Sequence, residues 1–352
     1  AGFYYKTMHK PAAVWPMAMK QIRKAAGIGV ISADYQMKGQ YDELFVKAEV
    51  TVIGGGAAGM TAALAAAESG QRVVLLESRP HLGGCFDYRV SVTAEGTPLY
   101  QRASELARKV EQTGNIRTST HTSMVGAYNN NLITAFQVGG PKESFTERYI
   151  EIRSDSVVVA TGCIERPLIF DHNERPGVMQ VGCAHRMART YGLLPGSEAV
   201  FSVGHDLGLE AAVDLFDLGL KINCVADIRE DGQNPELMLA LAERKIPVLK
   251  GWVAAKAHGG KKVEKVTLST VEGTVKRQFP CDLLVASAGL TPVTGPFILA
   301  QAKMGYDSHT GYFLPTMLPE KMFPAGRLTG VNNPSAIEAS GRLAGLKAAA
   351  AA

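Results

Sequence analysis

The most regular hydrophobic pattern of the chain begins at residue 50. Residues 50–53 are all β-branched, which is typical of a short buried strand. Residues 54–59 read Gly-Gly-Gly-Ala-Ala-Gly and residues 60–69 are rich in alanine, which predicts a turn followed by a helix. Another strand is predicted over residues 72–76, of which 73–76 are apolar, and it ends at Glu77.

The same order of elements recurs from residue 199. Residues 199–203 predict a strand, residues 211–218 a helix, and residues 221–226 a strand that ends at Asp227. The glycine that opens the turn and the acid after the second strand are 23 residues apart in both copies. Each copy continues into a predicted hairpin and a return strand; the hairpins turn at 129–131 and 259–261, and the return strands are 157–162 and 283–289.

Two copies of one plan indicate an α/β fold with two Rossmann-like dinucleotide-binding domains, the second inserted into the first. We expect a basic amino-terminal arm over residues 1–48, with a helix at residues 17–26. The first domain is then expected over residues 49–165 and 283–352, and the second over residues 166–282.

The first glycine turn has the residues that bind a diphosphate. In the pattern G-x-G-x-x-G, Gly54 allows the tight turn, Gly56 lets a pyrophosphate approach the backbone, and Gly59 lets helix and strand pack closely. The helix N-terminus supplies N–H donors and partial positive charge. Glu77 can accept hydrogen bonds from an adenosine ribose and would repel a 2′-phosphate. A turn of purely structural use does not explain an acid at this spacing.

The second turn departs from this pattern. In an alignment that starts at Gly204, Asp206 stands in the place of the second glycine and Leu209 in the place of the third. A carboxylate there repels a diphosphate, and a side chain blocks close approach of the backbone. If one residue is deleted in the alignment, Gly208 takes the place of the third glycine, but Asp206 remains in the turn. We therefore expect the second domain to keep the fold without binding a mobile nicotinamide cofactor.

Composition and charge narrow the class of protein. The 352 residues are 46% hydrophobic and 20% charged, which is ordinary for a globular protein of about two domains. The formal net charge is +4, but five basic residues precede the first acid, Asp34, which leaves 32 basic and 33 acidic residues in the rest. The body of the protein is nearly neutral, which argues against a nucleic-acid-binding protein.

The cysteines occur at positions 85, 163, 183, 224 and 281, without a C-x-x-C pair or a His cluster beside them. Zinc, haem attachment and a thioredoxin-like redox pair are not expected, and we assign no metal site. Such cysteine usage, and the lack of an apolar run of about 20 residues, predict a cytoplasmic protein with no membrane span. The chain begins without Met and ends in alanines, so we expect it to be part of a longer protein.

Several motifs resemble those of the flavoprotein superfamily with two dinucleotide-binding domains. They are the glycine turn with Glu77, His81-Leu82-Gly83-Gly84, Ala160-Thr161-Gly162 and Phe323-Pro324-Ala325-Gly326. Within it, the chain resembles the α subunit of heterotetrameric sarcosine oxidase and related amine-oxidising complexes. This narrower resemblance covers nearly the whole chain and rests on Tyr4-Tyr5-Lys6-Thr7, Trp15-Pro16, residues 22–27, residues 122–128, residues 158–168 and residues 175–179.

The resemblance implies a division of work between subunits. A separate β subunit is implied to bind the small-molecule amine and oxidise it with its own FAD, and small γ and δ subunits are implied to join the complex. An FMN is implied at the interface of the α and β subunits, and a tightly bound NAD in the first Rossmann pocket of the α subunit. The family's iron–sulfur and folate-binding domains are not expected in this chain, since five scattered cysteines cannot supply a cluster.

One residue of this chain favours NAD over FAD in the first pocket. FAD-binding members carry a Gly-Asp near the chain end, and this acid holds the ribityl hydroxyls of the flavin. Here Gly326 is followed by Arg327, so the acid is missing. FAD as the ligand, and a surface position for Arg327, are the alternatives.

The nucleotide is expected to contact five stretches of the chain. The predicted cofactor-binding residues are Gly54, Gly56, Ala57, Ala58, Gly59, Glu77, Ser78, Arg79, Gly84, Met124, Val125, Ala160, Thr161, Gly162, Gly326 and Arg327. Met124 and Thr161 are expected near the adenosine end, and Arg79 over the adenine or at a phosphate. We assign no catalytic residue: the cysteines are expected to be structural, the histidines show no carboxylate partners, and Glu165 and Arg166 are expected to form an ion pair between domains.

Together these features predict the α subunit of a heteromeric flavin-dependent secondary-amine oxidase, most like sarcosine oxidase, which converts sarcosine to glycine, a one-carbon unit and hydrogen peroxide. One alternative is a self-contained FAD-dependent NAD(P)H oxidoreductase, and another is a scaffold with a structural nucleotide. A third is a component of a related complex that oxidises proline, hydroxyproline, an opine, N-methylglutamate or glycine. The basic arm is expected to contact a partner chain or another domain, with a solvated arm as the alternative.

Overall fold

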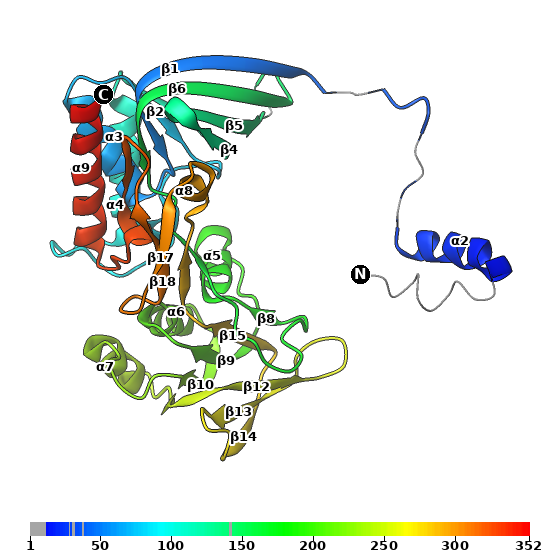
Figure 1. Ribbon diagram of the computed structural model, residues 1–352. Coiled ribbons are helices and arrows are strands. Elements are labelled where there is room, and N and C mark those ends of the chain that lie inside the picture. Colours follow the sequence, from blue (N-terminus) through cyan, green and yellow to red (C-terminus); the bar gives the residue numbers. More distant parts are fainter. Residues whose placement is uncertain (1–11, 28, 30–31, 37–38, 141–142) are drawn as a thin grey trace. The chain divides into compact units, whose positions relative to one another are not determined.

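The computed structural model describes residues 12–27, 29, 32–36, 39–140 and 143–352. The chain forms two compact units, residues 1–40 and Tyr41–Ala352, whose elements are labelled in Figure 1. In the first unit a short 3-10 helix, η1 (Ala12–Val14), leads into α2 (Trp15–Ala25), so the predicted helix is present, and no residue of α2 is buried. The leader motif Tyr4-Tyr5-Lys6-Thr7 lies outside the described residues.

A seven-stranded sheet forms the centre of the first nucleotide-binding domain. It contains β1 (Tyr41–Ile53), β2 (Val73–Leu76), β3 (Ile116–Ser119), β4 (Thr122–Tyr128), β5 (Leu132–Val138), β6 (Glu147–Val159) and β19 (Met322–Pro324). The order is β3-β2-β1-β6-β5-β4, and β19 pairs with β6. The predicted hairpin is β4–β5, with η3 (Asn129–Asn131) in its turn.

The predicted arm of residues 1–48 is too long. Residues 41–48 belong to β1, which pairs in parallel with β6 over its full length, from Tyr41 opposite Glu147 to Ile53 opposite Val159. Residues 50–53 at the end of β1 are all buried, whereas the first half of the strand is largely exposed and contains charged residues. The sequence pattern therefore predicted only the end of this strand.

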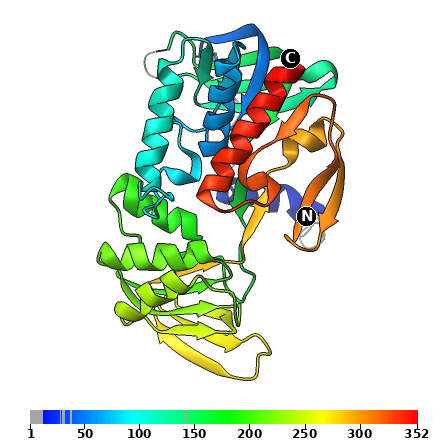
Figure 2. The same ribbon diagram turned by 90° about the vertical axis from the view of Figure 1, so that its left-hand side faces the viewer.

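Three helices cover one face of this sheet. In Figure 2 the red α9 (Pro334–Ala351), the blue α3 (Ala57–Glu68) and the cyan α4 (Leu99–Gln112) lie side by side, with α3 in the middle. Gly341 and Gly345 of α9 face α3, and a Cβ at either position would lie 2.2 Å from a backbone oxygen of α3. Small residues therefore let the backbones of α3 and α9 approach each other closely, and this packing holds α3 in place.

Replacing Gly345 by valine is expected to lower the free energy of unfolding by about 1–3 kcal/mol, the usual range for overpacking. The added Cβ would lie 2.2 Å from the carbonyl oxygen of Ala62, so the helices must separate. Ala350→Val, at an exposed position of the same helix, is the matched control and should change stability by less than about 0.5 kcal/mol. Urea unfolding followed by circular dichroism measures both, and equal losses would contradict the close approach.

A second sheet, of five parallel strands, forms the second domain. Its order is β11-β10-β9-β15-β8, and the strands are β8 (Val178–Met179), β9 (Glu198–Val203), β10 (Lys221–Asp227), β11 (Val248–Lys250) and β15 (Leu283–Ser287). Because β15 pairs with β8 and β9, the predicted domain boundary after residue 282 is too early: the return strand completes the second sheet.

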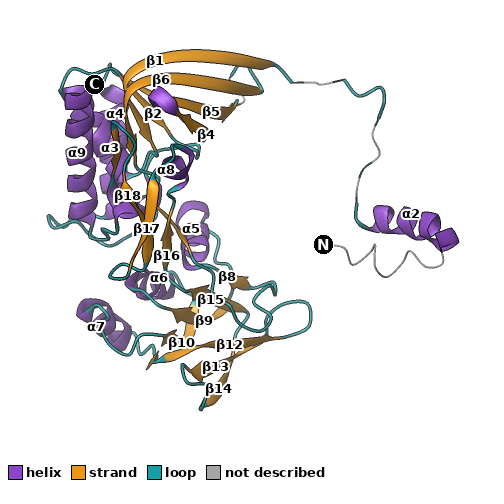
Figure 3. Ribbon diagram, viewed as in Figure 1, coloured by secondary structure: helices purple, strands orange, loops and turns teal. Residues whose placement is uncertain are grey.

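The second sheet has helices on one face and strands on the other (Figure 3). The helices are α5 (Val181–Tyr191), α6 (Asp206–Asp217) and α7 (Pro235–Glu243). The strands are β12 (Trp252–His258), β13 (Lys265–Thr270) and β14 (Lys276–Pro280), which form an antiparallel meander, and its first hairpin is the one predicted at residues 259–261. Each face of the sheet thus has its own buried apolar cluster.

Two extended segments connect the domains. The outgoing strand β7 (Cys163–Glu165) pairs antiparallel with the returning strand β16 (Leu290–Pro292). The chain then forms α8 (Gly295–Leu299), β17 (Lys303–Asp307), β18 (Tyr312–Met317) and η4 (Gly326–Thr329) before α9. The predicted fold, two Rossmann-like domains with the second inserted into the first, is confirmed. Over the described ranges, no helix has the length and apolar character that crossing a membrane requires.

A loop of the first domain packs against helices of the second. Arg89 Nε donates to Glu210 Oε1 at 3.0 Å and Nη2 donates to Oε2 at 2.5 Å, and both side chains are 9% exposed. Beside this pair, the Tyr88 ring meets the His185 ring edge-on, with 5.3 Å between centroids. His185 in turn is 2.7 Å from Asp214 of α6. These buried polar contacts hold the two domains in one relative orientation.

Candidate functional site

A cavity of about 920 Å³ extends from the first glycine turn to the second domain. Residues of the first domain line one side, and residues of β7, α5 and α6 line the other. The predicted cofactor-binding residues that line it are Gly54, Gly56, Ala57, Ala58, Glu77, Ser78, Arg79, Gly84, Met124, Ala160, Thr161, Gly162 and Arg327. The fold thus brings together residues that are more than 250 positions apart in the chain.

The glycine turn offers bare backbone to the cavity. Gly54 has a φ of +107°, and a Cβ there would lie 2.5 Å from the oxygen of Ala160. A Cβ on Gly84 would lie 2.7 Å from Gly56 Cα, so two glycine-rich loops are in backbone contact. Gly56 itself forms the N-cap of α3, whose first N–H groups are free to bind a diphosphate.

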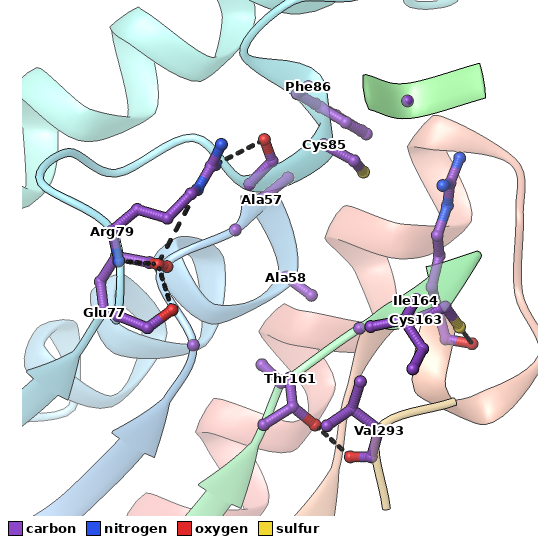
Figure 4. A pocket seen from close by; sticks show the side chains of 18 of the residues that line it. Ala57, Ala58, Glu77, Arg79, Cys85, Phe86, Thr161, Cys163, Ile164 and Val293 are labelled. Carbon is purple, nitrogen blue, oxygen red and sulfur yellow. Dashed lines mark hydrogen bonds and ion pairs between the residues drawn. The ribbon is translucent and has the colours of Figure 1, made fainter. Parts of the chain in front are cut away.

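Glu77 is buried at the end of β2 and fixed by backbone donors. Its Oε2 accepts a hydrogen bond from Gly55 N at 2.8 Å, and its Oε1 accepts one from Arg79 N at 2.8 Å. Oε1 also accepts a hydrogen bond from Ser78 Oγ at 3.2 Å, so Oε2 is the oxygen that keeps acceptor capacity for a ribose hydroxyl. Arg79 Nη2 donates to Gly84 O at 2.7 Å, and its guanidinium lies 3.5 Å from Asp87, so this cation is already paired (Figure 4).

Three predicted residues do not line the cavity. Gly59 lies behind the turn, where a Cβ would be 1.8 Å from Gly54 O, and Gly326 lies against α3, where a Cβ would be 2.6 Å from Ala58 Cβ. Both glycines allow close packing of the elements that form the cavity. Val125 is 51% exposed, because a bulge in β4 between Met124 and Gly126 shifts its register.

The opposite side of the cavity contains Cys163 and Ile164, as Figure 4 shows. Cys163 Sγ donates to Arg327 O at 3.4 Å, and burial raises the pKa of the Cys163 thiol to about 11. At neutral pH this cysteine is therefore a protonated thiol and not a nucleophile. Below it, Thr161 Oγ1 donates to Val293 O at 2.6 Å, which ties the end of β6 to the segment after β16.

Arg327 is buried, with 8% of its surface exposed, so the alternative of a surface position is wrong. Its Nε is enclosed without a hydrogen-bond partner, and its side chain lines the cavity. Within the part of the chain that the structure describes, Arg327 forms no ion pair. Arg327 therefore adds a buried cation to the lining of the cavity, at the position after Gly326.

The second glycine turn is one residue shorter than the first. Two residues separate β9 from α6, whereas three separate β1 from α3. Counted from the starts of the helices, His205 corresponds to Gly56 and Gly208 to Gly59. The alignment that placed Asp206 at the second glycine and Leu209 at the third is thus wrong, because the turn itself is contracted and Asp206 is the first residue of α6.

Side chains of the chain itself fill this second turn. His205 Nε2 lies 2.8 Å from Ser287 Oγ, and burial lowers the pKa of His205 to about 4, so the ring is neutral. Arg229 donates to Asp206 at 2.9 Å and to Asp227 at 2.8 Å. The side chain of His205 thus stands where the first turn has only backbone. Arg229 is paired with Asp227, the acid that corresponds to Glu77.

The predicted ion pair between Glu165 and Arg166 is absent among the described residues. Glu165 instead accepts a hydrogen bond from Gly182 N at the start of α5, and burial raises the pKa of the Glu165 carboxyl. Arg166 donates to Thr291 Oγ1 at 3.3 Å. Glu165 therefore holds the first turn of α5 by accepting a hydrogen bond from its backbone, and does not form an ion pair.

Sequence reasoning missed the cavity residues that the second domain supplies. They include Gln180, Gly182, Cys183, Arg186 and Leu207. No local motif marks them, since they lie on α5, just before it or at the start of α6, and line the cavity only after the two domains pack together. The His185–Asp214 contact was missed for the same reason: its partners are on different helices.

Comparison with known proteins agrees with this geometry. Residues 48–314 match the pyridine nucleotide-disulphide oxidoreductase family. The α subunit of sarcosine oxidase from Corynebacterium sp. (strain P-1) is 29% identical over 93% of this chain and 35% of its own length. One of the subunits of the opine oxidase of Agrobacterium tumefaciens (strain Ach5) is 25% identical over 86% of this chain and 65% of its own length.

Among solved structures, the thioredoxin reductase of T. acidophilum superposes with a TM-score of 0.67 at 18% identity, covering 87% of this chain and 97% of that one. This similarity shows the fold alone. The chain spans about a third of the length of the sarcosine oxidase relative, and the predicted resemblance to such α subunits is confirmed. With the family match extending over both Rossmann-like domains, the chain belongs to the pyridine nucleotide-disulphide oxidoreductase family.

Proposed function

We propose that this chain is the nucleotide-binding α-type subunit of a cytoplasmic, heteromeric, flavin-dependent secondary-amine oxidase, most like sarcosine oxidase. The observation that carries the proposal is similarity to the α subunit of a sarcosine oxidase over 93% of the chain. In this proposal a β subunit with FAD oxidises the amine, an FMN lies at the interface with that subunit, and γ and δ subunits join the complex. The similarity to the opine oxidase chain supports an opine as the alternative substrate.

For the first Rossmann pocket we propose NAD. Glu77 offers acceptor capacity to an unphosphorylated ribose and repels a 2′-phosphate, which favours NAD over NADP. Arg327 supports NAD over FAD, because the acid that would hold ribityl hydroxyls is replaced by a buried cation. The nucleotide then has a structural or electron-transfer role, and no catalytic residue of this chain is proposed.

The filled second turn argues against a self-contained NAD(P)H oxidoreductase. Such an enzyme needs a second site that a mobile nicotinamide nucleotide can enter and leave. Here His205 stands where the backbone would meet the diphosphate, and the Asp206–Arg229–Asp227 contacts occupy the ribose side. A nucleotide would have to displace a buried hydrogen bond and two ion pairs before binding.

Heat release of the bound nucleotide from the isolated α chain tests this proposal. We expect mass spectrometry of the supernatant from the isolated α chain to show NAD and no flavin. Purification through a tag on this chain should also recover a flavin-containing partner. Release of FAD, together with bleaching of that flavin by NADH, would support the reductase instead and contradict the proposed role within an oxidase complex.

Glu77→Gln is expected to weaken NAD binding about tenfold or more, since a hydrogen bond to a charged group contributes about 1.5–3 kcal/mol. Because the substitution also removes repulsion of a 2′-phosphate, the preference for NAD over NADP should shrink. Titration calorimetry of the nucleotide-free chain with both nucleotides measures this ratio. Glu68→Gln, on the exposed end of α3, is the control and should leave both affinities unchanged; an unchanged ratio in Glu77→Gln would contradict the ribose assignment.

A further inference from the structure

Two arginines from different domains line the cavity. Arg327 comes from η4 of the first domain and Arg186 from α5 of the second. Arg79, which also lines the cavity, is paired with Asp87 and with Gly84 O. Neither Arg327 nor Arg186 forms an ion pair with any residue that the structure describes.

The described groups on which the charge of Arg327 acts are themselves neutral. Its charge acts on Cys163, Tyr312 and His205. Burial raises the pKa of the Cys163 thiol and of the Tyr312 hydroxyl and lowers that of His205, so all three are neutral at pH 7. Only Nε of the guanidinium is enclosed, which leaves Nη1 and Nη2 in contact with the cavity.

Arg186 adds a second, partly buried donor to the cavity. Among the described residues its Nε has no hydrogen-bond partner, and its guanidinium carbon lies 5.3 Å from the centre of the Tyr88 ring. The acid on which the charge of Arg186 acts is Glu165: one of its oxygens accepts a hydrogen bond from Gly182 N, the other is enclosed without a described partner, and burial raises the pKa of this carboxyl. The first turn of α5, which supplies Gly182 and Cys183 to the cavity, contributes the positive end of a helix dipole.

An unpaired buried charge destabilises a protein by several kcal/mol, so a buried arginine that faces a cavity is expected to receive an anion from outside the chain. Guanidinium groups match the planar, two-oxygen geometry of carboxylate and phosphate. We infer that Arg327 and Arg186 form an anion-binding subsite for a phosphate monoester or a carboxylate, separate from the glycine turn. This inference goes beyond the proposed NAD and stands without it, because neither arginine is ion-paired within the described part of the chain, whatever binds at the turn.

The experiment follows the reactivity of each arginine in the purified complex towards phenylglyoxal, read by peptide mass spectrometry. Inorganic phosphate is the first probe. FMN is paired with riboflavin, and sarcosine with dimethylamine, so that each anion has an analogue that lacks only the anionic group. We expect an anion to slow modification of Arg327 and Arg186 at least fivefold and to leave Arg342, exposed on α9, unaffected.

Protection by phosphate and FMN but not riboflavin identifies a phosphate subsite, and protection by sarcosine but not dimethylamine identifies a carboxylate subsite. Protection by neither anion, or equal protection by the analogues, would overturn the inference. So would full protection of Arg327 by the nucleotide alone, since the anion would then be the diphosphate at the glycine turn. Loss of the proposed NAD would appear separately, in the heat-release experiment.

Arg327→Met gives a second readout that does not depend on reagent access. If Arg327 has no partner in the chain, the anion-free variant should have a melting temperature equal to or higher than that of the wild type. Phosphate should raise the melting temperature of the wild type and of the control Arg342→Met, but not that of Arg327→Met. A variant that melts lower without anion, or that still responds to phosphate, would contradict the subsite.

Discussion

Replacing Arg327 by aspartate is expected to change the nucleotide in the first pocket from NAD to FAD. The substitution restores the Gly-Asp pair of FAD-binding relatives next to the N-terminus of α3, where Gly326 contacts Ala58. An aspartate there can accept hydrogen bonds from ribityl hydroxyls, and it removes a buried cation. At about 1.5–3 kcal/mol for each hydrogen bond to a charged group, the relative affinity for FAD over NAD should rise about a hundredfold.

The nucleotide released by heat from the purified variant measures this exchange, by mass and by the visible absorbance of flavin. Arg327→Met is the matched control: it removes the same charge without supplying an acceptor, so it should not gain FAD. A variant Arg327→Asp that retains NAD and takes up no flavin from FAD-supplemented buffer would show that another residue selects the nucleotide.

Breaking the Arg89–Glu210 pair is expected to lower the free energy of unfolding by about 3–5 kcal/mol, the range for removing one partner of a buried ion pair. Arg89→Met leaves the carboxylate of Glu210, on α6, buried without its two arginine donors. The pair Arg244–Asp217 has the same two-point geometry but is more exposed, so Arg244→Met should cost only about 0–1 kcal/mol. Urea unfolding monitors both, and similar losses in the two variants would contradict a special role for the pair between domains.

The same pair predicts a pH dependence of stability. Burial raises the pKa of Glu210, but the hydrogen bonds and charge of Arg89 outweigh it, so the folded-state pKa lies below its usual range. Stability from this carboxylate is therefore present above the unfolded pKa of about 4.3 and is lost as pH falls through the lower folded pKa. The stability difference between wild type and Arg89→Met should be constant from about pH 6 to 8 and shrink below about pH 4; growth of the difference in acid would contradict this sign.

Local patterns predicted the elements of the fold well. The β-branched run before Gly54, the alanine-rich helix and the recurrence of both from residue 199 appear in the structure as β1, α3, β9 and α6. The boundaries of the strands and domains were harder to predict. The exposed half of β1 carries alternating polar residues, and β15 joins the second sheet through contacts with β8 and β9 that no local pattern shows.

The sequence by itself determined where a nucleotide can bind, because the chemistry of that site is local. A tight turn, a helix start and an acid at the end of the next strand depend on neighbouring residues and on spacing, and Gly54, Gly59 and Glu77 are all contained in one short stretch. The missing acid at Arg327 was also visible, because its position is marked by the preceding glycine.

Only the tertiary structure decided what surrounds that site. Packing of the second domain brings α5, with Arg186, to the cavity that the buried Arg327 also lines. It also showed that His205, not Asp206, replaces the second glycine, since the contracted turn can be counted only from the start of α6. Burial and pairing depend on residues distant in sequence, and an unpaired charge becomes visible only once every neighbour is in place.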